Sequence, residues 1–378
     1  MTTRARNNIQ CEWFDNPNRA WLEKAWQELE ERSDSNFFLS WWWIGTWLEC
    51  FVSEFTVIEA RQSGVTVGLG IVVTQASPMF SSRSRAKHYL HRTGVPDEDQ
   101  IWIEYNDFLI ASENSANVRA SMVSSTVNRM GSADALIIGA SKVDEFGSLK
   151  YPGLSERTIW ETTNYFLDLN RLRTSGTSLL NSLSKNARYQ IKRSIRKYKE
   201  IGELSVKKVI TQQGADELLA LAEPLHLARW GNGKSGSGFA NPKFIAFHKK
   251  LIAKGLGSGT VELNHIQAGD ETIGIVYNYR YRNTIYFYLC AMNYKHHSSQ
   301  YKPGLVTHYL LIEKALEEGV DIYDFMGGTA RYKATFSNEQ GNLAVYQFEH
   351  PRPLLSVEKQ IRKLKDKWVN DKQRLSSR

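Results

Sequence analysis

The residues that point most directly to chemistry lie between positions 301 and 336. The tripeptide Lys302-Pro303-Gly304, which follows Tyr301, is a turn signal, and Gly304 allows a ligand to approach the backbone. Apolar residues at helical spacing come next: Leu305, Tyr309, Ile312 and Leu316. Because a helix N-terminus presents free N–H groups and the positive end of the helix dipole, this turn predicts a site for an anion such as a phosphate. The same pattern also fits an ordinary unit of a protein core.

The elements on either side of this helix can be predicted from local signals. Gly319 indicates the end of the helix, residues 321–325 favour a short strand, and Gly327-Gly328 ends that strand. Three strands precede the turn, at residues 260–267, 272–281 and 284–292. Because short turns join them, we expect an antiparallel meander that leads directly into the 301–336 unit.

Composition sets broad limits on the class of protein. The chain has 378 residues, which suits two domains, and 42% of them are hydrophobic, enough for sizeable cores. Its formal net charge of +8 is compatible with nucleic acid, an anionic membrane surface or a phosphorylated ligand. Three scattered cysteines predict neither a disulfide framework nor a zinc site. Residues 37–55 contain charges and fall short of a membrane span, so we expect a soluble, cytoplasmic protein.

The first half of the sequence predicts a mixture of helices and strands. The expected elements are helices at 18–32 and 115–130, a hairpin at 55–73, strands at 101–110 and 133–139, and an edge-type strand at 158–169. A helix after residue 36 contains Trp41-Trp42-Trp43 and Trp47, which could stack a sugar or a base, or pack in a core. We expect a domain boundary between residues 170 and 176.

Two basic segments belong to the second half. An amphipathic helix within residues 178–202 carries seven basic residues on its polar faces: Lys185, Arg188, Lys192, Arg193, Arg196, Lys197 and Lys199. It could bind nucleic acid, a membrane surface or a phosphorylated ligand, or serve only solubility. A second basic amphipathic helix is expected after residue 357. Between them, residues 231–242 are rich in Gly and Ser but lack the spacing of a nucleotide-binding P-loop, so we expect a surface loop or lid.

Taken together, residues 176–348 resemble the CelD/BcsL-like acetyltransferase family of the GNAT superfamily. Three segments carry the resemblance: the basic helix, the meander with AGDETIGIVYNY at its centre, and residues 301–336. The resemblance implies an α+β protein with a tandem GNAT-like fold, in which a mixed sheet is flanked by helices. The two-lobed arrangement is also similar to the Fem-type ligases, which transfer amino acids from aminoacyl-tRNA to cell-wall precursors.

The resemblance also implies a mechanism and a set of site residues. Acyl-CoA, with acetyl-CoA as one form, would lie where two strands part, with its pyrophosphate on four residues of the turn: Tyr301, Lys302, Gly304 and Leu305. Asp324 would be a base or would orient the substrate, Tyr332 would protonate the leaving thiolate, and Lys333 would hold a carboxylate or phosphate. The turn departs from the glycine-rich pyrophosphate loop of many GNAT enzymes, because Gly304 is its one glycine after Ser298.

Four further side chains bear on the site. His308 lies on the apolar side of the helix, where a histidine is either catalytic or part of the core. Arg229 precedes the Gly-rich loop and is a candidate contact for the acceptor. His296-His297 has no third ligand at a useful spacing, so no metal site is predicted.

The sequence therefore predicts a GNAT-type acyltransferase with an N-terminal lobe at 1–170, a GNAT acetyltransferase domain at 171–350 and a basic tail at 351–378. The expected partners are acyl-CoA and an amine or hydroxyl acceptor, with a sugar of envelope polysaccharide synthesis as the expected acceptor. Contact with a membrane surface or with a polysaccharide-synthesis assembly fits the basic segments. Two alternatives stay open: a Fem-like transferase that uses aminoacyl-tRNA, and a GNAT-fold binding module without catalysis.

Overall fold

The computed structural model describes residues 9–77, 85–132, 134–147, 151–233 and 236–351. The first half contains β1 (Ile9–Asp15), α1 (Arg19–Glu30), η1 (Phe37–Leu39), α2 (Trp41–Phe51), β2 (Thr56–Gln62), β3 (Val65–Ser77), β4 (Arg85–Leu90), α3 (Pro96–Asp99), β5 (Leu109–Ile110), α4 (Ser115–Arg129), β6 (Ala135–Lys142), α5 (Val143–Phe146) and β7 (Ser155–Asp168). Three helices follow: α6 (Leu169–Ser175), α7 (Leu179–Ser182) and α8 (Lys185–Lys199). The second half contains β8 (Leu204–Lys208), α9 (Gln212–Trp230), η2 (Gly238–Ala240), α10 (Pro242–Gly255), β9 (Val261–Ala268), β10 (Glu271–Tyr281), β11 (Thr284–Met292), α11 (Pro303–Glu317), β12 (Ile322–Gly327), α12 (Arg331–Phe336) and β13 (Glu339–Glu349). Apart from Pro351, the predicted basic tail lies outside the described residues.

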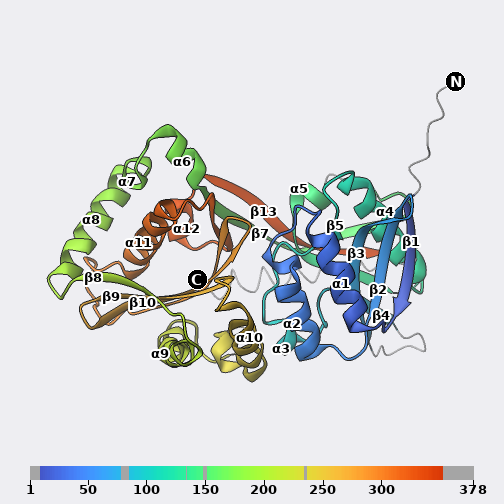
Figure 1. Ribbon diagram of the computed structural model, residues 1–378, viewed down its shortest axis with the longest axis horizontal. Coiled ribbons are helices and arrows are strands. Elements are labelled where there is room, and N and C mark those ends of the chain that lie inside the picture. The colour runs from blue at the N-terminus through green and yellow to red at the C-terminus, as the bar shows by residue number, and fades with distance from the viewer. Residues whose placement is uncertain (1–8, 78–84, 133, 148–150, 234–235, 352–378) are drawn as a thin grey trace, which may run out of the picture.

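The two halves repeat one order of elements. Each starts with a strand, continues through two helices and three antiparallel strands, and ends with a helix, a strand, a short helix and a strand. In this repeat β4 corresponds to β11, α4 to α11, and β6 to β12. The halves lie side by side, with β7 and β13 running between them (Figure 1). The repeated order is what a tandem arrangement of one fold produces.

A single mixed sheet passes through both halves. Its strand order is β1-β2-β3-β4-β6-β13-β7-β12-β11-β10-β9-β8, and β5 pairs with β3. The last strand of each half is inserted beside the other half, because β13 pairs with β6 and β7 pairs with β12. Since β7 and β13 also pair with each other, the halves share their central strands. The division of the chain at residues 170 and 171 therefore stays a prediction.

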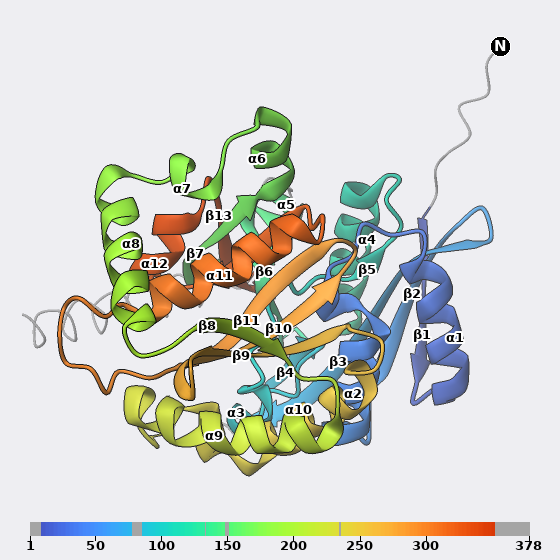
Figure 2. The same cartoon turned by 60° about the vertical axis from the view of Figure 1, so that its left-hand side comes forward.

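Helices cover both faces of the second half of the sheet. In Figure 2, α8, α11 and α12 lie on one side of these strands, and α9 and α10 lie on the other. This arrangement confirms the predicted α+β class, a mixed sheet flanked by helices. Within the described residues, no helix combines the length and the apolar character that crossing a bilayer would require.

The largest core cluster joins the two halves. The ring of Phe37 stacks on Tyr279 of β10 at 4.0 Å between centroids, and Trp43 of α2 meets Phe247 of α10 edge to face at 4.9 Å. Trp43 and Trp47 are almost completely buried. Removing a ring buried this deeply typically costs roughly 3–5 kcal/mol. The tryptophan-rich helix is therefore a core helix that fixes how the halves sit against each other.

The local predictions succeeded unevenly. The meander is confirmed as β9, β10 and β11, and the hairpin as β2 and β3. The predicted strand at 101–110 is wrong, because apart from β5 this segment is irregular and Trp102 and Tyr105 have positive φ angles of 47° and 52°. The prediction of an edge strand at 158–169 holds only before Asn164, because β7 has β13 as a partner over most of its length but is also paired with β12 from Asn164 to Asp168. Its polar residues indicated an edge, but its partner β13 comes from the far end of the chain.

Candidate functional site

The site is organised by two parallel strands that part. β11 and β12 pair over only three positions, from Thr284 with Ile322 to Tyr286 with Asp324. Beyond that point the remaining residues of β11 run on without β12. A cavity of about 670 Å³ lies against this gap. Its lining includes five residues of β11, namely Phe287, Tyr288, Leu289, Cys290 and Met292, together with the turn that follows β12.

The N-terminus of α11 meets the same cavity. Gly304 lines it, and a Cβ placed on Gly304 would have no heavy atom within 4 Å, so the space beside it is open. No side chain caps this helix end, because the N-cap residue Lys302 makes no capping hydrogen bond. An uncapped helix N-terminus is suited to an anion.

The other three turn residues predicted for cofactor binding do not line the cavity. Tyr301 stacks on His296 at 4.2 Å, the backbone N–H of Lys302 donates to Ser194 on α8 at 2.8 Å, and Leu305 packs against the core. Of the four, only Gly304 is therefore placed to touch a ligand in this cavity.

Charged groups from three elements gather where β12 ends. Lys333 of α12 lines the cavity and donates a hydrogen bond to the carbonyl of Gly327. The backbone N–H of Gly327 donates to the Glu104 carboxylate at 2.7 Å. Burial raises the pKa of Glu104 to about 7, although Lys333 and the Gly327 N–H oppose this rise. Burial also lowers the pKa of Lys333, and the nearby carboxylates of Glu104 and Asp324 oppose that shift.

Asp324 lies behind this group and does not line the cavity. Its Oδ1 accepts hydrogen bonds from the hydroxyl of Tyr105 at 2.8 Å and from the backbone N–H of Met326 at 2.7 Å. Asn164 of β7 donates to the same Tyr105 hydroxyl at 3.3 Å. Burial raises the pKa of Asp324 to about 6 against these hydrogen bonds. Asp324 thus ties the end of β12 to a segment of the first half.

Tyr332 and His308 form a stacked pair at the cavity wall. Their rings are 4.7 Å apart and nearly parallel, but only Tyr332 lines the cavity. Burial raises the pKa of Tyr332 well above its ordinary value, so its phenol is a neutral proton donor at neutral pH. His308 is fully buried, and burial lowers its pKa to about 3, so it is a neutral ring that supports Tyr332 from behind.

Arg229 lies on the opposite side of the cavity. It is near the end of α9, with its guanidinium over the rings of Trp230 and Tyr294 at 5.6 and 5.7 Å. All three residues line the cavity, and both rings are about half exposed. A cation held between two exposed aromatic rings is suited to an anionic or planar ligand group.

Glu104, Tyr105 and Trp102 were missed as site residues from the sequence. Trp102 lines the cavity, and the other two contact the end of β12 from a segment more than 200 positions earlier in the chain. The only signal was the presence of Glu104 and Asn106 in a stretch that alternates like a strand. Within the described residues, no group of three or more His, Cys, Asp or Glu side chains is placed to hold a metal ion.

Comparisons with known proteins agree with this geometry. Residues 185–334, from α8 to α12, match the family model described as an acetyltransferase (GNAT) domain. Because the first half repeats the order of elements of this matched half, the chain has a tandem GNAT-like fold. The crystal structure of FemX aligns with a TM-score of 0.56 and 11% identity over 89% of this chain and 96% of that one. The C-terminal domain of a protein described as a lysylphosphatidylglycerol synthetase from Agrobacterium fabrum aligns with a TM-score of 0.52 and 11% identity, over 87% and 92%.

At this level of identity the two solved structures show the fold alone. No curated protein matches the chain. The narrower resemblance to the CelD/BcsL-like family therefore stays a prediction, whereas the GNAT domain in the second half is matched directly. The matched segment contains the parted strands, the N-terminus of α11, and Arg229, Tyr332 and Lys333.

Proposed function

We propose that the chain is an acyltransferase that moves an acyl group from acyl-CoA to an amine or hydroxyl acceptor. The observation that carries this proposal is the cavity between β11 and β12, which is bordered by Gly304 at the uncapped N-terminus of α11. In GNAT enzymes, acyl-CoA lies in such a strand gap and its pyrophosphate rests on the following helix. The cavity of about 670 Å³ is large enough for a sizeable part of such a donor.

The residues around the cavity suit the chemistry of acyl transfer. The acceptor nitrogen or oxygen forms a bond to the thioester carbon, the carbon–sulfur bond breaks, and the acceptor loses a proton. The leaving thiolate needs a proton, which the neutral phenol of Tyr332 supplies. Lys333 keeps positive charge beside the developing negative charge, and Asp324 holds the end of β12 through its backbone contact.

The acceptor binds on the side of Arg229 in this proposal. An arginine between Trp230 and Tyr294 suits a phosphorylated or carboxylated group, such as that of a sugar nucleotide used for envelope polysaccharide. Acceptor identity is thus assigned by charge and shape alone.

Acyl-CoA is expected to stabilise the protein against thermal unfolding. A ligand that binds only the folded state at about 100 times its Kd adds roughly 2.7 kcal/mol to the free energy of unfolding. A thermal-shift titration with acetyl-CoA and longer acyl-CoAs tests this. Gly304→Glu is the matched control, because its side chain enters open space while its charge repels a pyrophosphate. Equal shifts in both proteins place CoA elsewhere. No shift with any acyl-CoA, together with no CoA release on a panel of amines, contradicts the proposal.

Replacing Tyr332 by Phe should slow the reaction and leave donor binding intact. The ring keeps its stacking on His308, so the change removes only the hydroxyl that protonates the thiolate. Loss of a general acid typically costs about 10²–10⁴-fold in rate. We expect kcat to fall by about 100-fold with the Kd for acyl-CoA unchanged. A kcat within about threefold of wild type would remove Tyr332 from the reaction.

One observation favours a second candidate, transfer from aminoacyl-tRNA. The α11 turn has a single glycine, and the basic helix α8 is bound to it through Ser194 with Lys302 and through Arg193 with the carbonyl of Ser299. A phosphate backbone lying on α8 would reach the same cavity mouth. This candidate requires tRNA affinity that falls steeply with salt, since each phosphate contact releases counterions. A flat salt profile removes it. If Asp324→Asn leaves cellular function intact and no donor binds, the chain is a binding module.

A further inference from the structure

The gap between β11 and β12 is here called the donor gap. The first half contains a corresponding gap, and a segment of the first half itself lies in that gap. β4 and β6 pair in parallel over three positions, from Lys87 with Ala135 to Tyr89 with Ile137, and then part as β11 and β12 do. In the second half the gap borders a cavity. In the first half, Asn106 lies in the corresponding gap between β4 and β6.

Asn106 bridges the two parted strands through its side-chain NH₂ group and its backbone. Its side-chain amide donates to the carbonyl of Leu90 on the β4 side at 2.8 Å and to that of Gly139 on β6 at 3.3 Å. Its backbone N–H donates to Ala140 at 2.8 Å, and its carbonyl accepts from the hydroxyl of Ser141. Asn106 is completely buried. These bonds replace the missing pairing, and the cavity beside Asn106 measures about 220 Å³, about a third of the 670 Å³ cavity of the second half.

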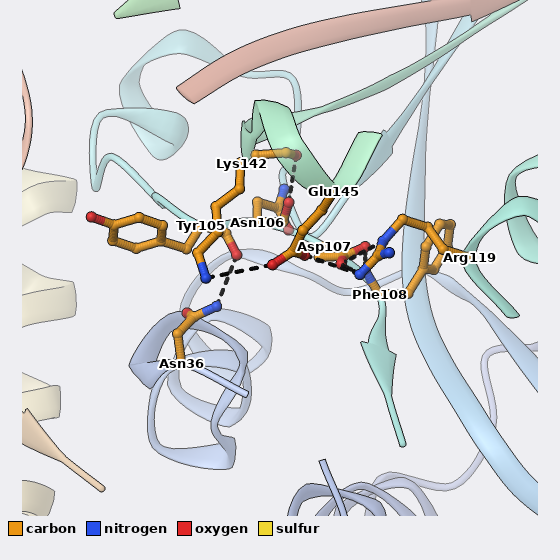
Figure 3. Close-up of polar contacts among 9 residues, drawn as sticks. Asn36, Tyr105, Asn106, Asp107, Phe108, Arg119, Lys142 and Glu145 are labelled. Atoms are coloured by element: carbon orange, nitrogen blue, oxygen red, sulfur yellow. Dashed lines mark hydrogen bonds and ion pairs between the residues drawn. The ribbon is translucent and has the colours of Figure 1, made fainter. Parts of the chain in front are cut away.

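The residues after Asn106 anchor the segment inside the first half. Asp107 accepts from the Arg119 guanidinium of α4, with 2.7 Å to Nε, and the same guanidinium reaches Glu145 of α5 at 2.9 Å. Asn36 donates to the carbonyl of Tyr105 at 2.9 Å. Figure 3 shows Asp107 directed to Arg119 on one side, while the Tyr105 ring points to the other.

The residues before Asn106 extend into the second half. Tyr105 donates to Asp324, and Glu104 accepts from Gly327 at the end of β12. Glu104 lies just behind the donor cavity, whose lining includes Trp102, Gly327, which donates to the Glu104 carboxylate, and Lys333, whose charge acts on it. Trp102 and Tyr105 have left-handed φ angles, which are unfavourable for bulky residues and typical of functional segments.

We propose that residues 101–108 form a cross-lobe segment that closes the corresponding gap of the first half and supplies Glu104 to the second half as the general base. This inference rests on the proposed acyltransferase function. Glu104 takes the proton that the acceptor nitrogen loses as it attacks the thioester carbon, and the thiolate leaves and takes a proton from Tyr332. Atoms and charges then balance without any further reactant.

The environment of Glu104 suits this role. The charged and titratable groups near it are Lys333 from α12, Asp324 from β12, Tyr288 from β11 and Tyr105 from its own segment. Burial raises its pKa to about 7, so a substantial fraction is ionised at neutral pH and the carboxylate is basic enough to accept a proton efficiently. Since the base must be ionised to act, activity should rise with pH through this value.

The test compares pH–rate profiles of wild type, Glu104→Gln and Glu98→Gln with acyl-CoA and an amine acceptor. Glu98 is the control, a carboxylate in the preceding helix whose ion pair is with Lys243 of α10. We expect the kcat/KM of Glu104→Gln to fall at least about 100-fold and its pH–rate profile to lose its rising limb, the rise near pH 7. Its acyl-CoA affinity and melting temperature should be unchanged. Glu104→Asp should keep the limb at a reduced rate. Glu98→Gln should keep both the rate and the limb.

The outcomes separate the two proposals. Turnover by wild type with an unchanged limb in Glu104→Gln overturns the role of Glu104 alone. Parallel loss of donor affinity or of thermal stability in Glu104→Gln also overturns it, since it shows a structural role. Wild type that neither binds acyl-CoA nor releases CoA overturns the acyltransferase function itself. Calorimetric titration should give one acyl-CoA per chain, and two sites would overturn closure of the first gap.

Discussion

Replacing Lys333 by Met should move the rising limb of the pH–rate profile upward by about 1–3 units. The ammonium group is the positive charge that opposes the raised pKa values of Glu104 and Asp324. A nearby opposite charge typically shifts a carboxyl pKa by about 1–3 units. Without it, the carboxyls hold their protons to higher pH, and the base form becomes scarce at neutral pH. Activity at pH 7 should therefore fall about 10–1,000-fold and recover partly at higher pH.

Arg331→Met is the matched control for this experiment. Arg331 belongs to the same short helix and lines the same cavity, but its side chain is exposed and none of the described contacts joins it to either carboxylate. Its replacement should leave the limb in place. If Lys333→Met loses activity equally at every pH, the ammonium acts by direct contact with the substrate. If the limb and the rate are both unchanged, Lys333 has no part in the reaction.

Much of the second half was predictable because its signals are local. The meander strands alternate with a period of two residues and are joined by tight turns, so β10 (Glu271–Tyr281) and β11 (Thr284–Met292) lie within a residue of their predicted bounds. The helix after Lys302-Pro303-Gly304 also has its stop signal in the sequence, at Gly319. These local patterns therefore predict the elements that border the donor gap. The basic helix was predicted as one element, and the structure divides it into α7 and α8 at Leu183 and Ser184.

The arrangement of Glu104, Tyr332 and Lys333 was only partly predictable, because contacts between distant segments assemble it. Tyr332 and Lys333 were found through a family pattern, and the cavity brings them together. Glu104 could not be found this way, since its position depends on Asn106 filling a gap in the first half and on Gly327 in the second. Buried residues alternate with less buried ones from 101 to 105, which imitates a strand, and residues 105–108 are all buried. No local signal distinguishes a strand from a segment that bridges two parted strands.

The ion pair of Arg119 and Asp107, which anchors residues 101–108, should be the point of the first half at which a substitution lowers stability most. Arg119 and Asp107 form a buried pair, and removing one partner leaves the other charge without compensation. Breaking a buried pair in this way typically costs about 3–5 kcal/mol. We expect Arg119→Met to lower the free energy of unfolding by about that amount, measured by urea denaturation. A single ion pair then accounts for a large share of a typical total stability of about 5–15 kcal/mol.

Two comparisons make the cause explicit. Arg129→Met, on the same helix α4, breaks an exposed pair with Asp15 and should cost no more than about 1 kcal/mol. The double variant Arg119→Met with Asp107→Leu removes both buried charges and should regain most of the loss, because replacing a buried pair by apolar side chains is often neutral. A double variant as unstable as Arg119→Met would show that the anchor acts by shape. Since Asp107 lies three residues after Glu104, Arg119→Met should also lose activity below its melting temperature, as the anchor of the first half releases the carboxylate that serves the second.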